Sequence, residues 1–407
     1  MERNIIKSYE YSNYEIDRFD MHVLMVPSWL YTETRPVLGS FFMEQAEAVS
    51  KNVSKMTIAF VEMSYLSVDR SKILVEFTDK WMSKKEHDGF DEYRAFSNSY
   101  IPRSYMCFNY IIYLNLKRLV KRIISEKGNI DIIHLQSVTT HGYAVKRISE
   151  EYKIPYVLTE HSTLFSRGKI ENNYKKIVEP VIKNATKIAC VGPGLKFELS
   201  KYSSLNIDVI PNMVNNDFFI TLEELKKKDG FHFVSIAFLT EKKGIDILLK
   251  AFALHLEKHS KSKLSIGGDG PCRKDLERLA KDLGIERSVE FLGELGRKDV
   301  LNLVALSHCF VLPSRHETFG VVFIEANAAG LPVIATKCDG PMSIINDSNG
   351  ILVDIDDENK LSDAMNTIYY DYLSYDLKKI QKDCYFNYSS RNIAKRIVKM
   401  YEEVVSK

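Results

Sequence analysis

The chain has 407 residues, more than a single hydrophobic core usually supports, so we expect two domains. Its 56 basic and 54 acidic residues leave a formal net charge of +2, which argues against a dedicated nucleic-acid surface. A composition of 45% hydrophobic and 27% charged residues is ordinary for a folded enzyme. We therefore expect a globular protein without a nucleic-acid partner.

Cysteine usage and apolar run lengths predict the compartment. Six cysteines are scattered without a CxxC pair, which predicts reduced thiols and neither a disulfide framework nor a zinc site. The start of the chain, "MERNIIKSYEYSNYEIDRFD", is too charged for a secretory signal. No apolar run approaches the ~20 residues that cross a bilayer. We expect a cytoplasmic protein, free or at the inner face of the membrane.

Short apolar runs, each followed by a turn, recur along the chain and usually lead into a helix. In the first half the strand candidates are "MHVLMVPSW", "DIIHLQS", "IPYVLTEHS" and "KIACVGPG". After residue 230 they are "FHFVSIAFL", "SKLSIGGDGP", "SVEFLGEL", "HCFVLPS", "PVIAT" and "GILVD". Strands that alternate with helices of about ten or more residues predict parallel sheets covered on both faces.

The rhythm is interrupted once, at "DVIPNMVNNDFFITLEELKKKDGF". We therefore predict an α/β protein with two doubly wound, Rossmann-like domains, residues 1–207 and 208–387, each with about five or six strands. Two such domains facing each other form a cleft. Ligands of such sheets bind beyond the carboxyl ends of the strands, so the segments after strands become the candidates for a site.

The segment "PSRHETFGVVFIEANAAGLP" carries two glutamates around a predicted turn and helix start. The backbone N–H groups at Phe319 and Gly320 begin that helix, and such a terminus attracts phosphates. Glu317 precedes the helix, where a polyhydroxyl ligand suits it better than a phosphate does. Glu325 lies inside, where its two oxygens can accept ribose hydroxyls. Taken singly, each is more readily structural, Glu317 as a helix-start acid and Glu325 as a core carboxylate satisfied by backbone. The pair, spaced E-x7-E around "TFG", favours the functional role.

This segment resembles the motif of glycosyltransferase family 4, whose members use nucleotide sugars and have the GT-B architecture. Further segments resemble the family in the same order: "HVLMVPSWLYTETRPVLGSFFMEQAEAV", "DIIHLQS", "YVLTEHS", "VIPNMVNNDFF", "KKGIDILLKAF", "SIGGDGP", "VEFLGEL" and "NGILVDIDD". The resemblance covers nearly the whole chain from about residue 21, and its specific motifs are in the C-terminal half. It implies an acceptor-side N-terminal domain, on which a last helix, 388–407, packs back.

The resemblance also implies roles for single residues. Glu317 would orient the donor sugar, and Glu325 would bind ribose. Lys243 would neutralise the leaving diphosphate together with the N–H groups after Thr318. Gly39 would let the backbone approach a phosphate, although it is equally an ordinary turn glycine.

One departure from the family concerns the second cation on the diphosphate. The family commonly has Gly-Arg after the first strand of the second domain, where this chain has Ala237 and Phe238. Arg315 is the candidate to replace that arginine. Gly268, in "GGDGP", is a candidate to line the pocket of the nucleotide base, although this stretch taken alone indicates only a turn.

Three histidines follow strands of the first domain. His141 begins a helix, and in similar transferases a histidine at that place approaches the donor sugar, so we favour it as catalytic. His134 lies on an apolar run and is more readily a satisfied core residue. His161 is the runner-up to His141, with a structural role equally open.

Two further features each have a structural explanation as well as a functional one. Residues 112–124 form a basic amphipathic helix, which is either a core helix with a solvated basic face or a peripheral membrane contact. Asp354 and Asp356 imitate a metal-binding DxD but are better explained as turn and helix-start residues. We expect no metal and no cofactor beyond the nucleotide-sugar substrate.

The predicted function is therefore that of a retaining glycosyltransferase, with retention implied by the resemblance. It would move a sugar from a nucleotide-diphosphate donor, by default a uridine one, to a hydroxyl of a glycan or lipid-linked glycan. Cell-surface polysaccharide assembly is the expected setting. Two alternatives stay open: a nucleotide-sugar epimerase on the same scaffold, and a catalytically inactive binding partner of a transferase, which the absent arginine suggests.

Overall fold

The computed structural model describes residues 18–32, 38–65, 82–99, 105–162, 165, 172–220 and 230–406. The chain divides into two compact units. The N-terminal unit comprises Glu15–Pro211 and Ser390–Lys407, and the C-terminal unit comprises Asn212–Ser389. The limits expected from the sequence, after residues 207 and 387, lie within a few residues of these.

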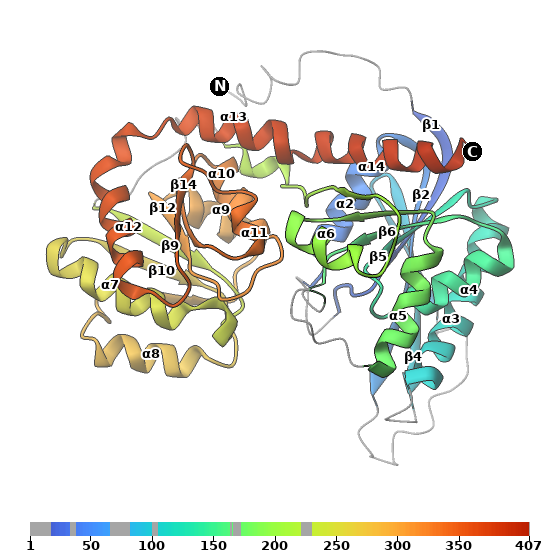
Figure 1. Ribbon diagram of the computed structural model, residues 1–407, viewed down its shortest axis with the longest axis horizontal. Helices are drawn as coiled ribbons and strands as arrows, with labels where there is room; N and C mark the ends of the chain where they lie inside the picture. The colour runs from blue at the N-terminus through green and yellow to red at the C-terminus, as the bar shows by residue number, and fades with distance from the viewer. Residues whose placement is uncertain are drawn as a thin grey trace. The chain divides into compact units, whose positions relative to one another are not determined.

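The N-terminal unit is built on an eight-stranded sheet of order β3-β4-β2-β1-β5-β6-β7-β8 (Figure 1). All neighbouring strands are parallel except β3 and β4. The strands are β1 Phe19–Pro27, β2 Val53–Tyr65, β3 Met82–His87, β4 Phe90–Ser99, β5 Ile132–Gln136, β6 Tyr156–Glu160, β7 Lys187–Cys190 and β8 Ile207–Val209. The central strands are apolar on both faces because helices cover both, and Val23–Val26 are completely buried.

The β3–β4 hairpin is not among the predicted strands. Its two-residue turn is Asp88-Gly89, with His87 paired to Phe90 and Gly89 at φ 82°. Asp-Gly is a strong local signal for such a turn because the glycine accepts a positive φ without strain. The hairpin widens the sheet beyond the five or six strands that we expect.

Helices α3 (Tyr105–Lys127), α4 (Gly142–Tyr152) and α5 (Asn172–Asn184) pack side by side on one face of this sheet. The other face is covered by α2 (Ser40–Ser50) and α14 (Ser390–Val405), which contact each other, and α6 (Pro193–Ser200) contacts β7 and β8. Ile393, Ile397 and Tyr401 form the buried face of α14. The hydroxyl of Tyr401 lies 2.6 Å from Nδ1 of His134, so a buried hydrogen bond joins the last helix to β5.

Helix α3 corrects the expected membrane contact through residues 112–124. Ile112, Leu116, Leu119 and Ile123 are completely buried against the rest of the unit. The basic residues occupy the outer face, where Lys117, for example, pairs with Glu151 of α4. The apolar stripe is thus a core face, as in the core-helix alternative, and these buried side chains are not available to a membrane.

The C-terminal unit contains a six-stranded parallel sheet of order β11-β10-β9-β12-β13-β14. Its strands are β9 His232–Ile236, β10 Lys263–Gly267, β11 Val289–Gly293, β12 Cys309–Leu312, β13 Val333–Thr336 and β14 Gly350–Val353. Every one of them is a strand that the sequence predicts. The prediction of two parallel-sheet α/β units is confirmed.

Helices α7 (Ile245–Lys258), α8 (Arg273–Asp282) and α12 (Glu358–Asp371) cover one face of this sheet, while α9 (Arg297–Ala305) and α10 (Val321–Ala328) cover the other (Figure 1). Helix α13 (Leu377–Tyr388) packs on α10. Short elements complete the unit: α11 (Asp339–Met342) and the 3₁₀ turns η3 (Asn216–Phe218), η5 (Glu241–Lys243) and η6 (Tyr372–Ser374).

The strand order reverses at one place in each sheet. In the C-terminal unit this switch lies between β9 and β12, whose following segments carry Lys243 and Glu317. In the N-terminal unit it lies between β1 and β5, whose following segments carry Gly39 and His141. Such switch points are where open parallel sheets bind ligands, because the two flanking connections leave the sheet in opposite directions.

Candidate functional site

The turn between β12 and α10 holds the two glutamates of the sequence motif. Gly320 caps α10 at φ 89°, and a Cβ there would lie 2.4 Å from the Phe323 ring and 3.1 Å from Cγ of Glu317. Glycine is therefore required for this helix to begin beside Glu317. Phe319 is buried and Thr318 is half-buried, so the expected donor-binding backbone lies on a packed turn.

Lys243 and Glu317 form an ion pair, with Nζ 2.5 Å from Oε2. Their side chains are 16% and 14% exposed, so the pair is largely screened from water yet reachable. The sequence predicts a role for each but does not predict that they touch. A cation and a carboxylate thus meet at the carboxyl edge of the sheet.

Gly244 explains how the two come together across 74 residues of sequence. It has φ 67°, and a Cβ on it would lie 2.1 Å from the carbonyl oxygen of Pro313. The backbone of the η5–α7 junction therefore runs directly against the β12–α10 turn. Any side chain at this position would push Lys243 away from Glu317.

Glu325 is 4% exposed and pairs with Arg297, whose guanidinium lies 2.6 Å from Oε1. Burial raises the pKa of Glu325 above its ordinary value, and Arg297 opposes that shift. Arg297 is the first residue of α9, and its guanidinium stacks over the buried Phe218 ring at 4.8 Å. The buried carboxylate of the motif therefore has a charged partner, as burial of an ion requires.

Arg315 is committed to its own unit's carboxylates. Its guanidinium donates to Asp246 at 2.8 and 3.0 Å, to Asp356 at 2.6 Å and to the carbonyl of Glu241. These bonds occupy four of its five N–H groups. The side chain holds the β12–α10 turn to the start of α7, and a contact with a phosphate would require exchange of these ion pairs.

The turn after β10 lies against the residues that replace the family's Gly-Arg. Gly268 has φ 118°, and a Cβ there would be 1.9 Å from the carbonyl oxygen of Ala237. The glycine is thus required by close packing on the β9 loop. Phe238 is 64% exposed, so an aromatic ring projects where the resemblance leads us to expect a cation.

Gly39 caps α2 in the N-terminal unit with φ 70°. A Cβ on it would approach the carbonyl oxygen of Trp29 to 3.0 Å and Cα of Leu30 to 3.2 Å. The turn itself therefore accounts for glycine at this position. Its contact with a phosphate stays a prediction.

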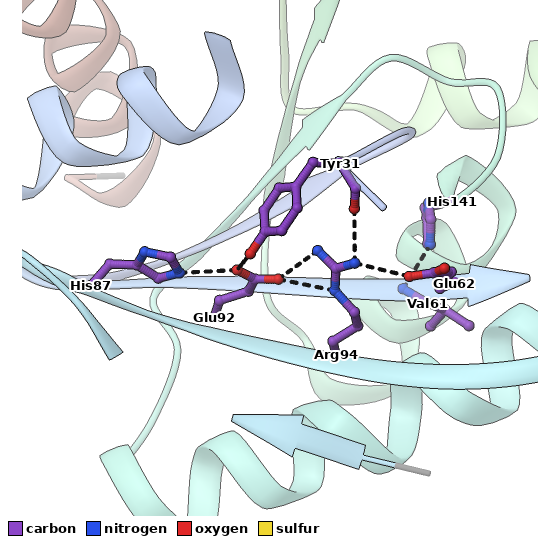
Figure 2. Close-up of polar contacts among 7 residues, drawn as sticks. All are labelled: Tyr31, Val61, Glu62, His87, Glu92, Arg94 and His141. Atoms are coloured by element: carbon purple, nitrogen blue, oxygen red, sulfur yellow. Dashed lines mark hydrogen bonds and ion pairs between the residues drawn. The ribbon is translucent and has the colours of Figure 1, made fainter. Parts of the chain in front are cut away.

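His141 lies at the start of α4 and is completely buried. Its Nε2 accepts the backbone N–H of Val61 at 3.2 Å, so the proton of the neutral ring is on Nδ1 (Figure 2). Burial lowers the pKa of His141 to about 4. Among the described residues Nδ1 has no hydrogen-bond partner, which leaves a buried donor without an acceptor.

The two other histidines are tied into the interior of the sheet. His134 contacts Tyr401 and, at 2.8 Å, the hydroxyl of Thr159, which agrees with a satisfied core residue. His161 contacts Oε1 of Gln136 at 2.7 Å.

Next to His161, Glu160 is completely buried and accepts from Ser137 Oγ and from the backbone of Val138, His161 and Ser162. These bonds hold Ser137 at φ 69° in the loop that leads to His141.

Asp354, half of the apparent DxD, forms ion pairs with Lys337 and Lys360. Hydrogen bonds from these two lysines lower its pKa to about 2. Asp356 pairs with Arg315. Both acids thus have cationic side-chain partners.

These two parallel-sheet units, with a lysine and two glutamates at the carboxyl edge of the second sheet, define a glycosyltransferase of the GT-B fold. Residues 218–383 match the family described as glycosyl transferases group 1, and residues 81–218 match glycosyltransferase family 4. An uncharacterized glycosyltransferase of Methanocaldococcus jannaschii is 31% identical over 67% of this chain and 75% of that protein. The chain belongs to glycosyltransferase family 4 and is a glycosyltransferase.

More distant relatives and solved structures agree with this assignment. The gpi3 subunit of the phosphatidylinositol N-acetylglucosaminyltransferase of Schizosaccharomyces pombe is 29% identical over 61% of this chain and 55% of that protein. The sucrose-phosphate synthase of Thermosynechococcus elongatus superposes with a TM-score of 0.73 at 18% identity, covering 95% and 99% of the two chains. Anabaena HepE in complex with UDP has a TM-score of 0.71 at 17% identity, covering 94% and 100%. These structural likenesses establish the fold.

Arg297 is the site residue that sequence reasoning missed. It lies in "GELGRKDV", a stretch without a short motif of its own, and it reaches Glu325, 28 residues away, only in the folded chain. One signal was present. A glutamate inside an apolar helix requires a cation, and arginines at helix starts after strands are the natural candidates.

Proposed function

We propose that the protein transfers a sugar from a nucleotide-diphosphate donor to a hydroxyl of a glycan or lipid-linked glycan, with retention of anomeric configuration. The observation that carries this proposal is the ion pair of Lys243 and Glu317 at the beginning of α10. It combines, at one edge of a parallel sheet, a cation for a diphosphate and a carboxylate for sugar hydroxyls.

The chemistry requires a leaving diphosphate to be stabilised while positive charge develops on the anomeric carbon. Lys243 supplies a preorganised cation for the diphosphate, and the N–H groups at Phe319 and Gly320 supply dipoles beside it. Once Lys243 turns to phosphate, Glu317 is released to accept hydroxyls of the sugar. A phosphate oxygen of the leaving group then takes the proton of the acceptor hydroxyl on the same face.

Glu325 binds the ribose in this proposal. Two adjacent hydroxyls suit the two oxygens of an ionised carboxylate. Arg297 favours that ionised form, because it opposes the pKa increase that burial causes. Oε1 is directed by the arginine, so the carboxylate has a defined orientation when the nucleotide arrives.

His141 is assigned to the donor sugar. Its Nδ1–H is buried and lacks an acceptor among the described residues, and an unpaired buried donor costs about 1–3 kcal/mol unless a ligand oxygen satisfies it. The low pKa keeps the ring neutral at pH 7, so it donates a hydrogen bond without adding a charge.

The relatives support uridine and lipid or glycan acceptors as first choices. Anabaena HepE is described with UDP, with UDP and glucose, and with UDP-glucose. An alpha-monoglucosyldiacylglycerol synthase of Streptococcus pneumoniae is 28% identical over 52% of this chain and 53% of that protein. On this basis we propose a role in the assembly of a cell-surface polysaccharide or lipid-linked glycan, and the cytoplasmic location stays the expectation from the sequence.

Contact with a membrane, if the acceptor is lipid-linked, requires a surface other than the core face of α3. No helix in the described part of the chain has the length and apolarity to cross a bilayer. On α3 the side chains of Met106, Tyr110 and Leu114 are exposed and follow one another at helical spacing. A peripheral contact would use this stripe.

Phe238 keeps the inactive-partner alternative open, because the diphosphate then depends on Lys243 and the helix start alone. A screen of nucleotide sugars for thermal stabilisation identifies the donor, since a ligand of the native state raises Tm. Nucleotide release with that donor is then measured for the wild type and Glu317→Gln. We expect loss of release in the variant. No stabilisation by any nucleotide sugar, or release without transfer or hydrolysis, contradicts a transferase.

A further inference from the structure

A second constellation of charged side chains lies in the N-terminal unit, outside the residues assigned to the donor. We call it the Arg94 cluster: Tyr31, Glu62, His87, Glu92 and Arg94 (Figure 2). Arg94 donates to Glu92 Oε1 at 2.7 and 3.0 Å, to Glu62 Oε2 at 2.8 Å and to the carbonyl of Tyr31 at 2.8 Å. The Tyr31 hydroxyl and the His87 ring reach Glu92 Oε2 at 2.6 and 3.0 Å.

Strand register puts these side chains on one face of the sheet. Arg94 of β4 pairs with Phe60 of β2, two residues before Glu62, and Glu62 pairs with Phe96. Because side chains alternate between faces, Phe60, Glu62, Arg94 and Phe96 project together. The opposite face of β4 carries Tyr93, whose hydroxyl bonds Glu126 of α3. The cluster thus belongs to the face away from α3.

The hydrogen bonds of the Arg94 cluster disfavour an anion at the guanidinium. Arg94 is 7% exposed, and its four bonds occupy four of five N–H groups. Glu92 and Glu62 occupy the guanidinium, and the exposed Lys85 lies over the Tyr31 ring with Nζ 5.7 Å from the centroid. A phosphate beside Glu62 would therefore meet a carboxylate whose arginine has one N–H group left.

Glu62 is the more accessible of the two carboxylates in the cluster. Its side chain is 27% exposed, and the single contact it makes within the described residues is the one from Arg94 to Oε2. Oε1 therefore has its full capacity to accept hydrogen bonds. Arg94 holds the carboxylate in one orientation, which lowers the entropy that a ligand would otherwise have to remove.

The position of Glu62 is also that of a ligand site. Glu62 follows Val61 near the carboxyl end of β2, and the N–H of Val61 donates to His141. Figure 2 draws the side chains of Glu62 and His141 at the arrow end of that strand. His141, which we assign to the donor sugar, therefore lies at the same end of the strand as Glu62. The Phe60 ring lies 5.2 Å from the His141 ring, and Phe96 is 38% exposed. Aromatic rings beside a carboxylate suit the apolar faces and hydroxyl edges of a polyol.

We propose that Glu62, oriented by Arg94, binds hydroxyl groups of a neutral polyhydroxyl acceptor and excludes acceptors that present a phosphate at this position. This inference rests on the proposed function and deepens it, because it names the acceptor class. Arg94 is a positioning residue in this arrangement. Tyr31 and Glu92 hold Arg94, so that the buried part of the cluster supports one exposed carboxylate.

The experiment uses the full chain, the donor found by thermal stabilisation, and two matched acceptor pairs. The pairs are myo-inositol with myo-inositol 1-phosphate, and methyl α-glucoside with glucose 6-phosphate. Glu62→Gln is compared with Glu47→Gln, which alters an exposed glutamate of α2 that pairs with Lys51. Acceptor KM, donor KM and donor hydrolysis without acceptor are measured for each variant.

We expect the wild type to prefer the neutral member of each pair. Glu62→Gln should raise the neutral acceptor's KM about tenfold or more, because a charge-assisted hydrogen bond is lost. Donor KM and donor hydrolysis should stay unchanged, as should all constants of Glu47→Gln. Glu62→Lys should shift preference toward the phosphorylated member.

Two results overturn the inference: an acceptor KM in Glu62→Gln equal to that of Glu47→Gln, or a wild-type preference for the phosphorylated acceptors. Failure of the proposed function has a different appearance, because no nucleotide sugar would then stabilise the wild type and no nucleotide would be released with any combination of donor and acceptor. Tm of Glu62→Gln serves as the folding control. Rescue of acceptor KM by Glu62→Asp would support contact over a purely structural role.

Discussion

Each unit contains a buried glutamate paired with an arginine, and the two behave differently. Glu325 of the C-terminal unit is 4% exposed and Glu92 of the N-terminal unit is 3% exposed, so both lose most of their hydration. The pKa of Glu325 is raised by burial, with Arg297 opposing. Burial also acts to raise the pKa of Glu92, but hydrogen bonds from Tyr31, Arg94 and His87 bring it below its ordinary value.

The number of donors explains this difference. Arg297 is 39% exposed and reaches one oxygen of Glu325, whereas Glu92 receives two bonds from a buried Arg94 and others on its second oxygen. Similar exposed surface thus goes with opposite pKa shifts, because desolvation acts more strongly on Glu325 and several hydrogen bonds favour the charged form of Glu92. Glu325, with few hydrogen bonds, can still accept bonds from a ligand. Glu92, whose two oxygens are already bonded, instead holds neighbouring side chains in place.

The largest expected effect is on stability, at the buried pair of Arg94 and Glu92. Arg94→Met should lower the free energy of unfolding by about 3–5 kcal/mol, because it leaves the buried Glu92 without its cation. Urea denaturation measures this change. The matched control is Arg122→Met, whose guanidinium forms a half-exposed helix pair with Glu126 and should contribute less than about 1 kcal/mol. Similar losses of stability in the two variants would mean that the buried pair contributes no more than the half-exposed one.

The next effect concerns the Lys243–Glu317 pair. Lys243→Met should lower kcat by about 10²–10³-fold, since it removes a preorganised charge from the leaving diphosphate. Initial rates of nucleotide release measure it. Lys281→Met, at an exposed position of α8, is the control. A Lys243→Met enzyme with wild-type kcat would restrict this lysine to stabilising Glu317.

Lowering the pH should unfold the N-terminal unit before the C-terminal unit. Burial lowers the pKa of His134 to about 3 and of His141 to about 4 in the N-terminal unit, and of His255 to about 4 in the C-terminal unit. The unfolded chain binds these protons near pH 6.5, so stability is full above that pH and is lost as the pH falls toward 4.

A histidine pKa lowered from 6.5 to about 4 corresponds to about 3 kcal/mol. The N-terminal unit has two such residues, and both tryptophans of the chain, Trp29 and Trp81, belong to its sequence. Tryptophan fluorescence should therefore change at a higher pH than the circular dichroism of the whole chain. His141→Gln should move that change to lower pH, whereas the exposed His316→Gln should not.

The smallest expected effect is on nucleotide binding, at the pair of Glu325 and Arg297. Arg297→Met should weaken UDP binding about tenfold at neutral pH, and the loss should grow as the pH falls. The reason is that the pKa of Glu325, already raised by burial, rises further without Arg297, and a protonated carboxyl accepts ribose hydroxyls poorly. Calorimetry between about pH 5.5 and 8 measures this, with 2′-deoxy-UDP as the second ligand.

Arg297→Lys should recover part of the affinity, and Arg278→Met, on the exposed surface of α8, should change nothing. A loss in Arg297→Met that is the same at every pH would mean that the arginine contacts the nucleotide directly. Unchanged binding would mean that Glu325 does not need its partner.

Local pattern accounts for the parts of this protein that were predicted. Parallel strands buried on both faces show as continuous apolar runs, so all six strands of the C-terminal sheet could be recognised before any coordinates. The glutamates of the β12–α10 turn are eight residues apart, close enough for a short motif to relate them. The β3–β4 hairpin was missed although Asp88-Gly89 marks it, because its strands are polar and alternate weakly with apolar residues.

The sequence by itself determined the fold class and the family, the glutamates of one turn and the lysine expected to act with them. Only the tertiary structure decided which distant charges meet: Lys243 with Glu317, Arg297 with Glu325, and Arg94 with Glu62. It also decided that the apolar stripe of α3 belongs to the core. Apolar periodicity is a property of neighbouring residues, whereas an ion pair across 28 to 74 residues depends on strand register and on close backbone packing at a glycine.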